Sequence, residues 1–195
     1  GFARLLHCRN MAGHSKWAQI KRQKAATDAA KARVFSRFAR LIALESKNAG
    51  GDMSSPALAA VIARAKAANM PKDNIERAVA KGALKDAGDM ERVVYEAYGP
   101  GGAAIVVDAL TDSRNRTTQE VKLIFTKAGI EMATPGAATW AFTKSPDSGF
   151  RANEPLMDLS EEDGEKLGAL LDQLDEHDDV QSVSTNARGY ENTGD

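Results

Sequence analysis

The sequence predicts an α+β protein in which a basic three-helix domain precedes a four-stranded α+β sandwich with two helices on one face. Apolar residues recur at helical spacing through residues 28–82, whereas β-branched runs bounded by turn signals dominate after residue 91. The charge also changes sign along the 195 residues: residues 1–90 hold 17 Lys/Arg and 7 Asp/Glu, and residues 91–195 hold 9 and 20. Such a split is typical of a polyanion-binding part joined to an acidic part.

We expect a helical domain over residues 11–82, an α+β domain over residues 91–187 and a tail over residues 188–195. The polar stretch between the two domains is interpreted as a linker. Residues 1–10 are too short for a secretory signal, and Met11 has the character of a natural start. We therefore interpret residues 1–10 as a leader or artefact and leave them out of the fold.

Three helices are expected in the first domain. The first spans residues 28–48, with an apolar stripe on one side and a row of arginines on the other. Ser55-Pro56 starts the second helix, because serine favours the cap position and proline the first turn. The third helix begins near Pro71 and ends at Gly82. One stripe on each helix is enough for a small shared core.

The second domain opens with a hairpin, formed by strands at residues 92–98 and 103–110 around the Gly99–Gly102 turn. A helix over residues 117–128 follows, and Thr117 with Glu120 matches a capping box at its start. Residues 138–143 are expected to form a third strand of the same sheet.

A loop over residues 144–159 leads to the last two elements. Ser160 caps a helix whose inner face is leucine-rich, and residues 180–185 form the fourth strand. The chain is expected to fray from Asn186.

The candidate contact surface is the basic arm and first helix, where Asp28 is the only acid between Met11 and Leu44. Lysine and arginine bind phosphate without strict spacing. Trp17 either stacks on an unpaired base or anchors the arm on the helical core. Two arginines before the capped helix are a second candidate for holding an anion. The predicted nucleic-acid-binding residues are His14, Ser15, Lys16, Trp17, Lys21, Arg22, Lys24, Lys31, Arg33, Arg37, Arg40, Arg114, Asn115 and Arg116.

Catalysis finds no support in the sequence. The spacings of metal ligands, nucleophile elbows and phosphate loops are absent, and Gly99–Gly102 precedes a strand rather than a helix. We therefore predict a protein that is not an enzyme, with no cofactor, metal or small-molecule substrate. The single cysteine, Cys8, fits a reducing compartment such as the cytoplasm, and no apolar run is long enough for a membrane span.

Three stretches of the sequence resemble the YebC/PmpR family. They are residues 11–17 (MAGHSKW), residues 67–78 (AANMPKDNIERA), and residues 98–102 (YGPGG) together with residues 109–117 (ALTDSRNRT). That family includes bacterial probable transcriptional regulators and the mitochondrial translational activator of cytochrome c oxidase. Ser113 stands where the family usually has asparagine. The resemblance covers about residues 11–143 and 155–187.

The resemblance implies a helical N-terminal domain followed by α+β domains. It implies DNA binding with transcriptional control in some members, and in others association with the ribosome that helps synthesis through proline-rich stretches. It also implies a nucleic-acid surface that includes His14 to Trp17 with Lys21, Arg22 and Lys24. The mitochondrial matrix is then the alternative location. Family members usually insert a third domain where this chain has only the loop over residues 144–159, so that domain is expected to be absent.

Two classes of function remain open. The first is a regulator that binds ribosomal RNA, at the ribosome, or promoter DNA, because phosphate contacts look alike in both. The second is a protein–protein interaction module that acts through its acidic α+β domain.

Overall fold

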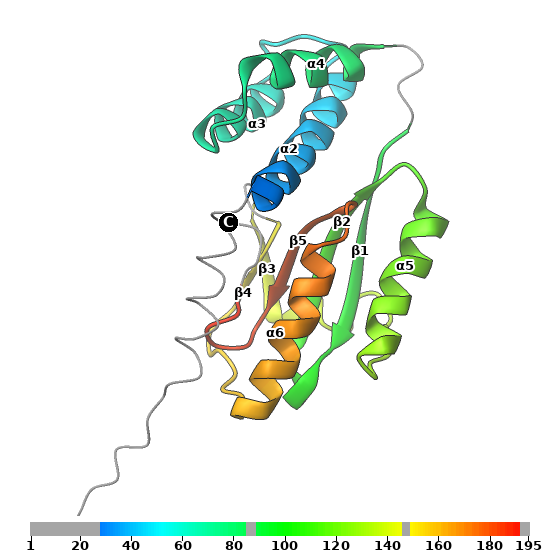
Figure 1. The fold of residues 1–195 in the computed structure, drawn as a ribbon, viewed down its shortest axis with the longest axis vertical. Coiled ribbons are helices and arrows are strands. Elements are labelled where there is room, and N and C mark those ends of the chain that lie inside the picture. The colour runs from blue at the N-terminus through cyan, green and yellow to red at the C-terminus, as the bar shows by residue number, and fades with distance from the viewer. Residues whose placement is uncertain (1–27, 85–88, 146–148, 192–195) are drawn as a thin grey trace, which may run out of the picture.

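The computed structural model describes residues 28–84, 89–145 and 149–191. The helices α2 to α4 form one part of the molecule, here called the helical part, and the remaining elements form the α/β part (Figure 1). The elements are α2 (Asp28–Asn48), α3 (Pro56–Ala67), α4 (Lys72–Ala83), β1 (Glu91–Tyr98), η1 (Pro100–Gly102), β2 (Ala104–Thr111), α5 (Arg114–Lys127), η2 (Thr139–Ala141), β3 (Phe142–Ser145), β4 (Gly149–Ala152), α6 (Glu161–Asp175) and β5 (Val180–Thr185).

The helical part closes around one small core, as the apolar stripes predict. Ile42 of α2, Leu58 and Ile62 of α3 and Ile75 of α4 are buried together. Ser55 takes the cap position of α3 and Pro56 its first turn. Between α2 and α4 the backbones approach closely, because a Cβ on Gly82 would lie 2.2 Å from the carbonyl oxygen of Ala43. The three expected helices are confirmed.

The α/β part is built on an antiparallel sheet with strand order β1-β2-β5. The hairpin is confirmed, with Glu91 opposite Thr111 and Tyr98 opposite Ala104. Helices α5 and α6 cover the same face of the sheet (Figure 1), and Phe125 and the α6 leucines pack there against Ile105 and Val107. The α+β class and the pair of helices on one face are therefore confirmed.

The expected four-stranded sheet is wrong in its strand count. Residues 139–141 form a 3₁₀ turn, and β3 pairs only with β4, in a separate two-stranded sheet. Ala141 and Phe142 pack against Ala104 and Val106, on the face of the main sheet that the helices leave open. The short hairpin thus covers the second face instead of extending the first sheet.

Two local expectations are also wrong. Helix α5 begins at Arg114, one turn before Thr117, so Thr117 lies inside the helix and is fully buried. The chain does not fray at Asn186, because the Asn186 side chain accepts a hydrogen bond from the Ala104 amide at 2.9 Å. Ala187 and Tyr190 after it are buried in the main core.

The apolar clusters of the described residues each lie within one part of the molecule. One cluster is made by the three helices, and the other two lie on the two faces of the main sheet. The helical and α/β parts therefore meet mainly through polar side chains. Among the described helices, none is both long and apolar enough to cross a membrane.

Candidate nucleic-acid interface

The predicted arginine row of α2 faces the end of α6. Arg33, Arg37 and Arg40 fall on one side of the helix because their spacing matches its 3.6-residue period. Arg33 Nη1 lies 3.4 Å from Glu176 Oε1, and Arg37 Nη2 lies 3.1 Å from Asp175 Oδ1. Arg37 also donates to the main-chain carbonyl of Asp175.

The row is therefore not freely accessible, although the sequence predicts it as part of the contact surface. The arginine side chains are only 31%, 13% and 25% exposed, in chain order. Sequence periodicity separates the apolar side of a helix from its polar side. It does not show that an acidic segment far along the chain will cover the polar side, and Asp175 lies 138 residues after Arg37.

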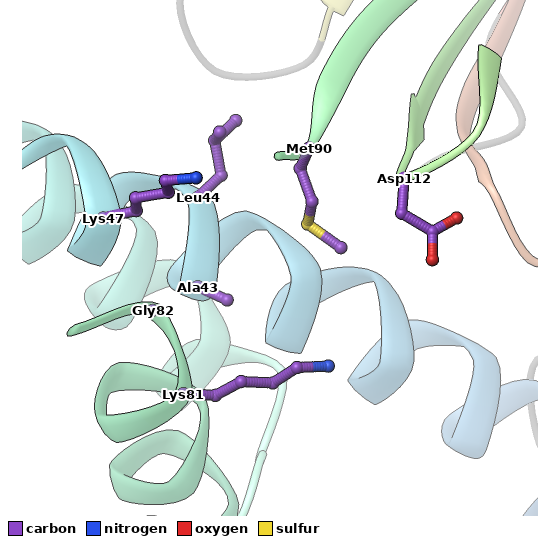
Figure 2. Close-up of a pocket in the computed structure, with 7 residues that line it drawn as sticks. All are labelled: Ala43, Leu44, Lys47, Lys81, Gly82, Met90 and Asp112. Carbon is purple, nitrogen blue, oxygen red and sulfur yellow. The ribbon is translucent and has the colours of Figure 1, made fainter. Parts of the chain in front are cut away.

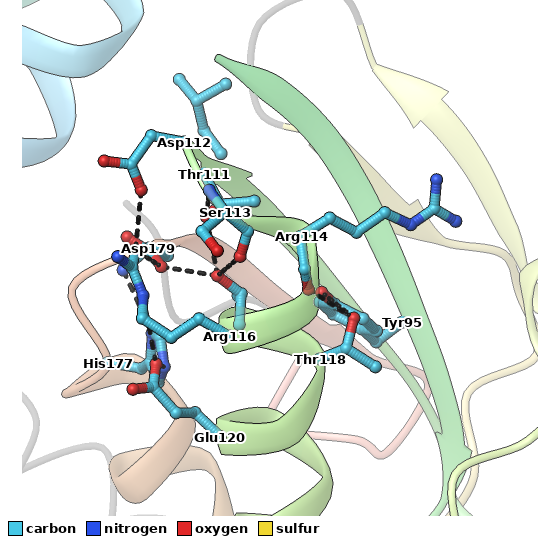
Figure 3. Close-up of polar contacts among 12 residues, drawn as sticks. Tyr95, Thr111, Asp112, Ser113, Arg114, Arg116, Thr118, Glu120, His177 and Asp179 are labelled. Atoms are coloured by element: carbon cyan, nitrogen blue, oxygen red, sulfur yellow. Dashed lines mark hydrogen bonds and ion pairs between the residues drawn. The ribbon is translucent and has the colours of Figure 1, made fainter. Parts of the chain in front are cut away.

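Asp179 lies at the centre of the contact. Its carboxylate accepts hydrogen bonds from Thr117 Oγ1 at 2.7 Å and Arg116 Nη2 at 2.9 Å, and it also pairs with Arg40. Burial raises the pKa of this carboxyl, but the three donors outweigh burial and hold the pKa well below its ordinary value. The ionised carboxylate thus joins α2, α5 and the turn before β5. Figure 3 shows its contacts on the α5 side.

The second predicted group lies in the first turn of α5. Arg114, Asn115 and Arg116 are all exposed. Arg114 Nη1 pairs with Glu91 Oε1 at 2.9 Å. Arg116 Nη2 pairs with Asp112 Oδ1, also at 2.9 Å, and Figure 3 shows this second pair. The hydrogen bond from Arg116 to Asp179 raises the pKa of its guanidinium. These cations lie at a helix N-terminus, as expected, and carboxylates already neutralise part of their charge.

His177 belongs to the same cluster. Its Nδ1 accepts from the Asp179 amide at 3.1 Å, and its Nε2 lies 2.9 Å from Glu120 Oε2. A proton on Nε2 satisfies both contacts with a neutral ring. Glu120, His177 and Asp179 lie close enough to share a cation. Such an ion would meet the guanidinium groups of Arg40 and Arg116, so the donor set favours anchoring of side chains over metal binding.

A groove runs between α2 and α4. Its lining combines apolar side chains such as Phe35 and Met70 with the cations Arg40, Arg77 and Lys81. A second hollow continues it toward the α/β part, lined by Lys47, Lys81, Met90 and Asp112 among others (Figure 2). Sequence reasoning did not select Arg77 or Lys81, although their i, i+4 spacing on the third helix places them on one side.

The remaining predicted residues divide into two groups. Lys31 is exposed on the first turn of α2. The other seven predicted residues, His14, Ser15, Lys16, Trp17, Lys21, Arg22 and Lys24, lie outside the described residues.

Comparison with known proteins places both parts of the chain in one family. Residues 15–85 match the TACO1/YebC protein N-terminal domain, and residues 90–147 match the TACO1/YebC second and third domain. A "probable transcriptional regulatory protein" of Leptospira biflexa serovar Patoc is 43% identical over 187 residues, which cover 93% of this chain and 73% of the relative.

A protein of the same name from Francisella tularensis subsp. novicida is 38% identical over 237 aligned positions, covering 91% of this chain and 96% of the relative. That alignment is longer than the 195-residue chain, so the relative has positions without a counterpart here. This agrees with the expected absence of the third domain.

A solved structure supports the same assignment. The crystal structure of a conserved hypothetical protein from Aquifex aeolicus superposes with a TM-score of 0.75 at 30% identity, covering 89% of this chain and 96% of that one. The chain therefore belongs to the TACO1/YebC family, as a short member with fewer domains, and its curated relatives are named as transcriptional regulators.

Proposed function

We propose that this protein is a non-enzymatic regulator of gene expression that binds nucleic acid through its helical part and the basic segment before it. The observation that carries the proposal is the cationic groove between α2 and α4, where Arg40, Arg77 and Lys81 surround an apolar floor. Residues 1–90, which include this groove, hold 17 cations against 7 acids. Such a cluster attracts a nearby phosphate backbone and contacts it without base specificity.

The residues proposed to bind are the fourteen predicted from the sequence, together with Arg77 and Lys81. The lysines and arginines contact phosphate, whereas Trp17 stacks on an unpaired base. Arg33, Arg37 and Arg40 contribute when the acidic end of α6 is displaced from them, because they are paired with it in the structure.

Two targets fit this surface, RNA at the ribosome and promoter DNA. The names of the curated relatives favour transcription, and resemblance to the translational activators favours a ribosome-associated factor that helps synthesis through proline-rich stretches. Both targets present phosphates to the same groove, in the cytoplasm or the mitochondrial matrix. Neither function requires a cofactor, a metal or a small-molecule substrate.

The test is binding measured over a salt series, by co-sedimentation with ribosomes and by a mobility shift of duplex DNA. The variant Arg77→Ala/Lys81→Ala removes two groove cations, and Lys122→Ala/Lys127→Ala removes two exposed cations from α5 as a matched control. We expect the groove variant to bind more weakly, with a log–log salt slope reduced by about 0.7 to 0.9 per lost contact, and the control to bind as the wild type does.

Equal losses in both variants would show that only net charge matters, and no loss in either would place the contact elsewhere. The protein–protein alternative predicts a further outcome. In that case, removal of residues 11–50 leaves binding to ribosomes and DNA unchanged, because the acidic α/β part makes the contact through a protein partner.

A further inference from the structure

We propose that the acidic segment 172–179, at the C-terminal end of α6, competes with nucleic acid for the arginine row of α2. The segment occupies Arg33, Arg37 and Arg40 in the closed molecule and is displaced when a phosphate backbone binds. This inference concerns regulation of the surface described above and rests on the proposed function.

The segment is electrostatically unfavourable as the end of a helix. The C-terminus of a helix carries a partial negative charge, which favours lysine and arginine nearby. The last turn of α6 contains no basic residue. Five acids lie in this turn and the four residues after it: Asp172, Asp175, Glu176, Asp178 and Asp179. The carboxylates repel one another, and the helix dipole adds negative charge at the same end. Both effects stabilise a cation placed beside the segment.

The arginine row supplies the cations, and its guanidinium groups contact the oxygens of the acidic segment as they would contact phosphate oxygens. Arg37 Nη2 donates to both the carboxylate and the main-chain carbonyl of Asp175, so one guanidinium nitrogen contacts two oxygens of one residue. Arg40 pairs with Asp179 and also donates to the Leu110 carbonyl at 3.3 Å. Guanidinium groups bind carboxylate and phosphate oxygens with the same geometry, so the two anions exclude each other.

The contact is suited to reversal because the two parts have separate apolar cores. The buried clusters of the described residues do not extend from the helical part to the α/β part. The ion pairs of Arg33 and Arg37 are partly exposed, and such pairs are individually weak and are screened by salt. Interfaces of this polar kind allow relative motion of the parts they join.

Separation of the acidic segment from the arginine row would leave neither Asp175, Glu176 nor Asp179 buried without a partner. When Arg40 withdraws, Asp179 keeps its hydrogen bonds from Thr117 and Arg116, both within the α/β part. Asp175 and Glu176 are only partly covered and return to water, because their side chains are 29% and 58% exposed even in the closed molecule. The arginines exchange the carboxylate oxygens of the acidic segment for the phosphate oxygens of the nucleic acid.

The decisive variant is Asp175→Asn/Glu176→Gln, which removes two acids that face the arginine row. Glu131→Gln/Glu165→Gln is the matched control, since it changes net charge equally at two other exposed positions. The probe is a short fluorescent single-stranded RNA, with duplex DNA as a second arm, titrated by anisotropy at low salt. We expect the first variant to bind roughly fivefold or more tightly than the control. Equal affinities for the two variants overturn the competition.

A second readout follows the domain contact itself. Spin labels at Met53 of the helical part and Leu123 of α5, both exposed, report the distance between the parts in a Cys8→Ser background. We expect added RNA and the Asp175→Asn/Glu176→Gln change to lengthen or broaden this distance, while the control variant leaves it unchanged. An RNA-bound protein that keeps the closed distance overturns the inference.

The two readouts separate the possible failures. If RNA and DNA bind but the acidic-segment variant gains nothing over its control, the proposed function stands and the competition is wrong. If neither nucleic acid binds any variant, yet the label distance still responds to Asp175→Asn/Glu176→Gln, the ionic contact is purely structural and both proposals fail.

Discussion

At the scale of single residues, buried carboxylates organise the α/β part. The Asp179 side chain is 4% exposed and is satisfied by one hydroxyl and two guanidinium groups from α2 and α5. Glu96, also buried, accepts main-chain hydrogen bonds from Gly136, Ala138 and Thr139 at 2.7, 2.6 and 2.9 Å. Each of these carboxylates fixes a segment that has little regular structure of its own.

Asp179 should make stability depend on acid pH. Its folded pKa lies below the ordinary value of 3.8, so the unfolded chain takes up the proton first. The stabilisation is therefore complete above the unfolded pKa and is lost as the pH falls toward the folded one. We expect Asp179→Asn to cost about 2–3 kcal/mol at neutral pH and less as the pH falls below about 4. Urea unfolding across this pH range measures the difference in free energy of unfolding between the wild type and Asp179→Asn. A difference that does not change with pH would contradict this role of Asp179.

Glu96 should hold the loop that carries Trp140. Burial raises the pKa of its carboxyl, but the three main-chain donors lower it by more. Glu96→Gln places an amide N–H against those donors, so we expect a loss of about 1–3 kcal/mol. Hydrogen exchange should accelerate at Gly136, Ala138 and Thr139. The exposed Glu131→Gln is the control, and unchanged exchange at the three amides would count against this role.

At the scale of elements, two serines at helix starts differ in a way that only the structure shows. Ser160 Oγ accepts from the Asp163 amide at 3.1 Å, whereas the Ser113 side chain makes no such bond at the start of α5. We expect Ser160→Ala to lower the stability of the protein by about 1 kcal/mol and Ser113→Ala to lower it by only a few tenths. Thermal unfolding of the pair measures this, and equal losses would contradict the difference.

The elements also show how far sequence reasoning reaches. Helices α2, α3 and α4 follow from apolar periodicity, because each buries an apolar stripe. Strands β1, β2 and β5 follow from β-branched runs bounded by turn residues, and all eight residues of β2 are buried. The sequence predicts the start of α5 one turn too late because Thr117 fits a capping motif. In the structure its hydroxyl bonds Thr111 and Asp179 across the fold. Strands β3 and β4 have four residues each, too few for a clear alternation.

The candidate site was predictable in composition but not in pairing. The sequence identifies the basic residues of α2, since a row of like charges opposite an apolar stripe is local information. Their partners Asp175, Glu176 and Asp179 lie more than a hundred residues away, and nothing local connects the two segments. Arg77 and Lys81 line a groove only because α4 packs on α2, and the local sequence does not predict this packing.

At the scale of the whole molecule, separate cores predict separate unfolding. The helical part has the smaller core, and its contact with the α/β part is ionic. We expect two calorimetric transitions, with the lower one assigned to the helical part. If the ion pairs contribute about 1 kcal/mol to the stability of the helical part, high salt should lower the midpoint temperature of this transition by about 4–8 °C. The upper transition should move much less, and a single transition at every salt concentration would contradict separate cores.

The end-to-end placement of the two parts has a consequence for how the molecule approaches a target. The helical part, in the positively charged half of the sequence, lies at one end of the fold, and the negatively charged α/β part lies at the other (Figure 1). With a net charge of −1, the protein feels almost no overall pull toward a polyanion. It does feel a torque, because the polyanion's field attracts one end and repels the other. Collisions are thereby biased toward one orientation, and a bound molecule turns its negative end outward, where it repels like-charged surfaces.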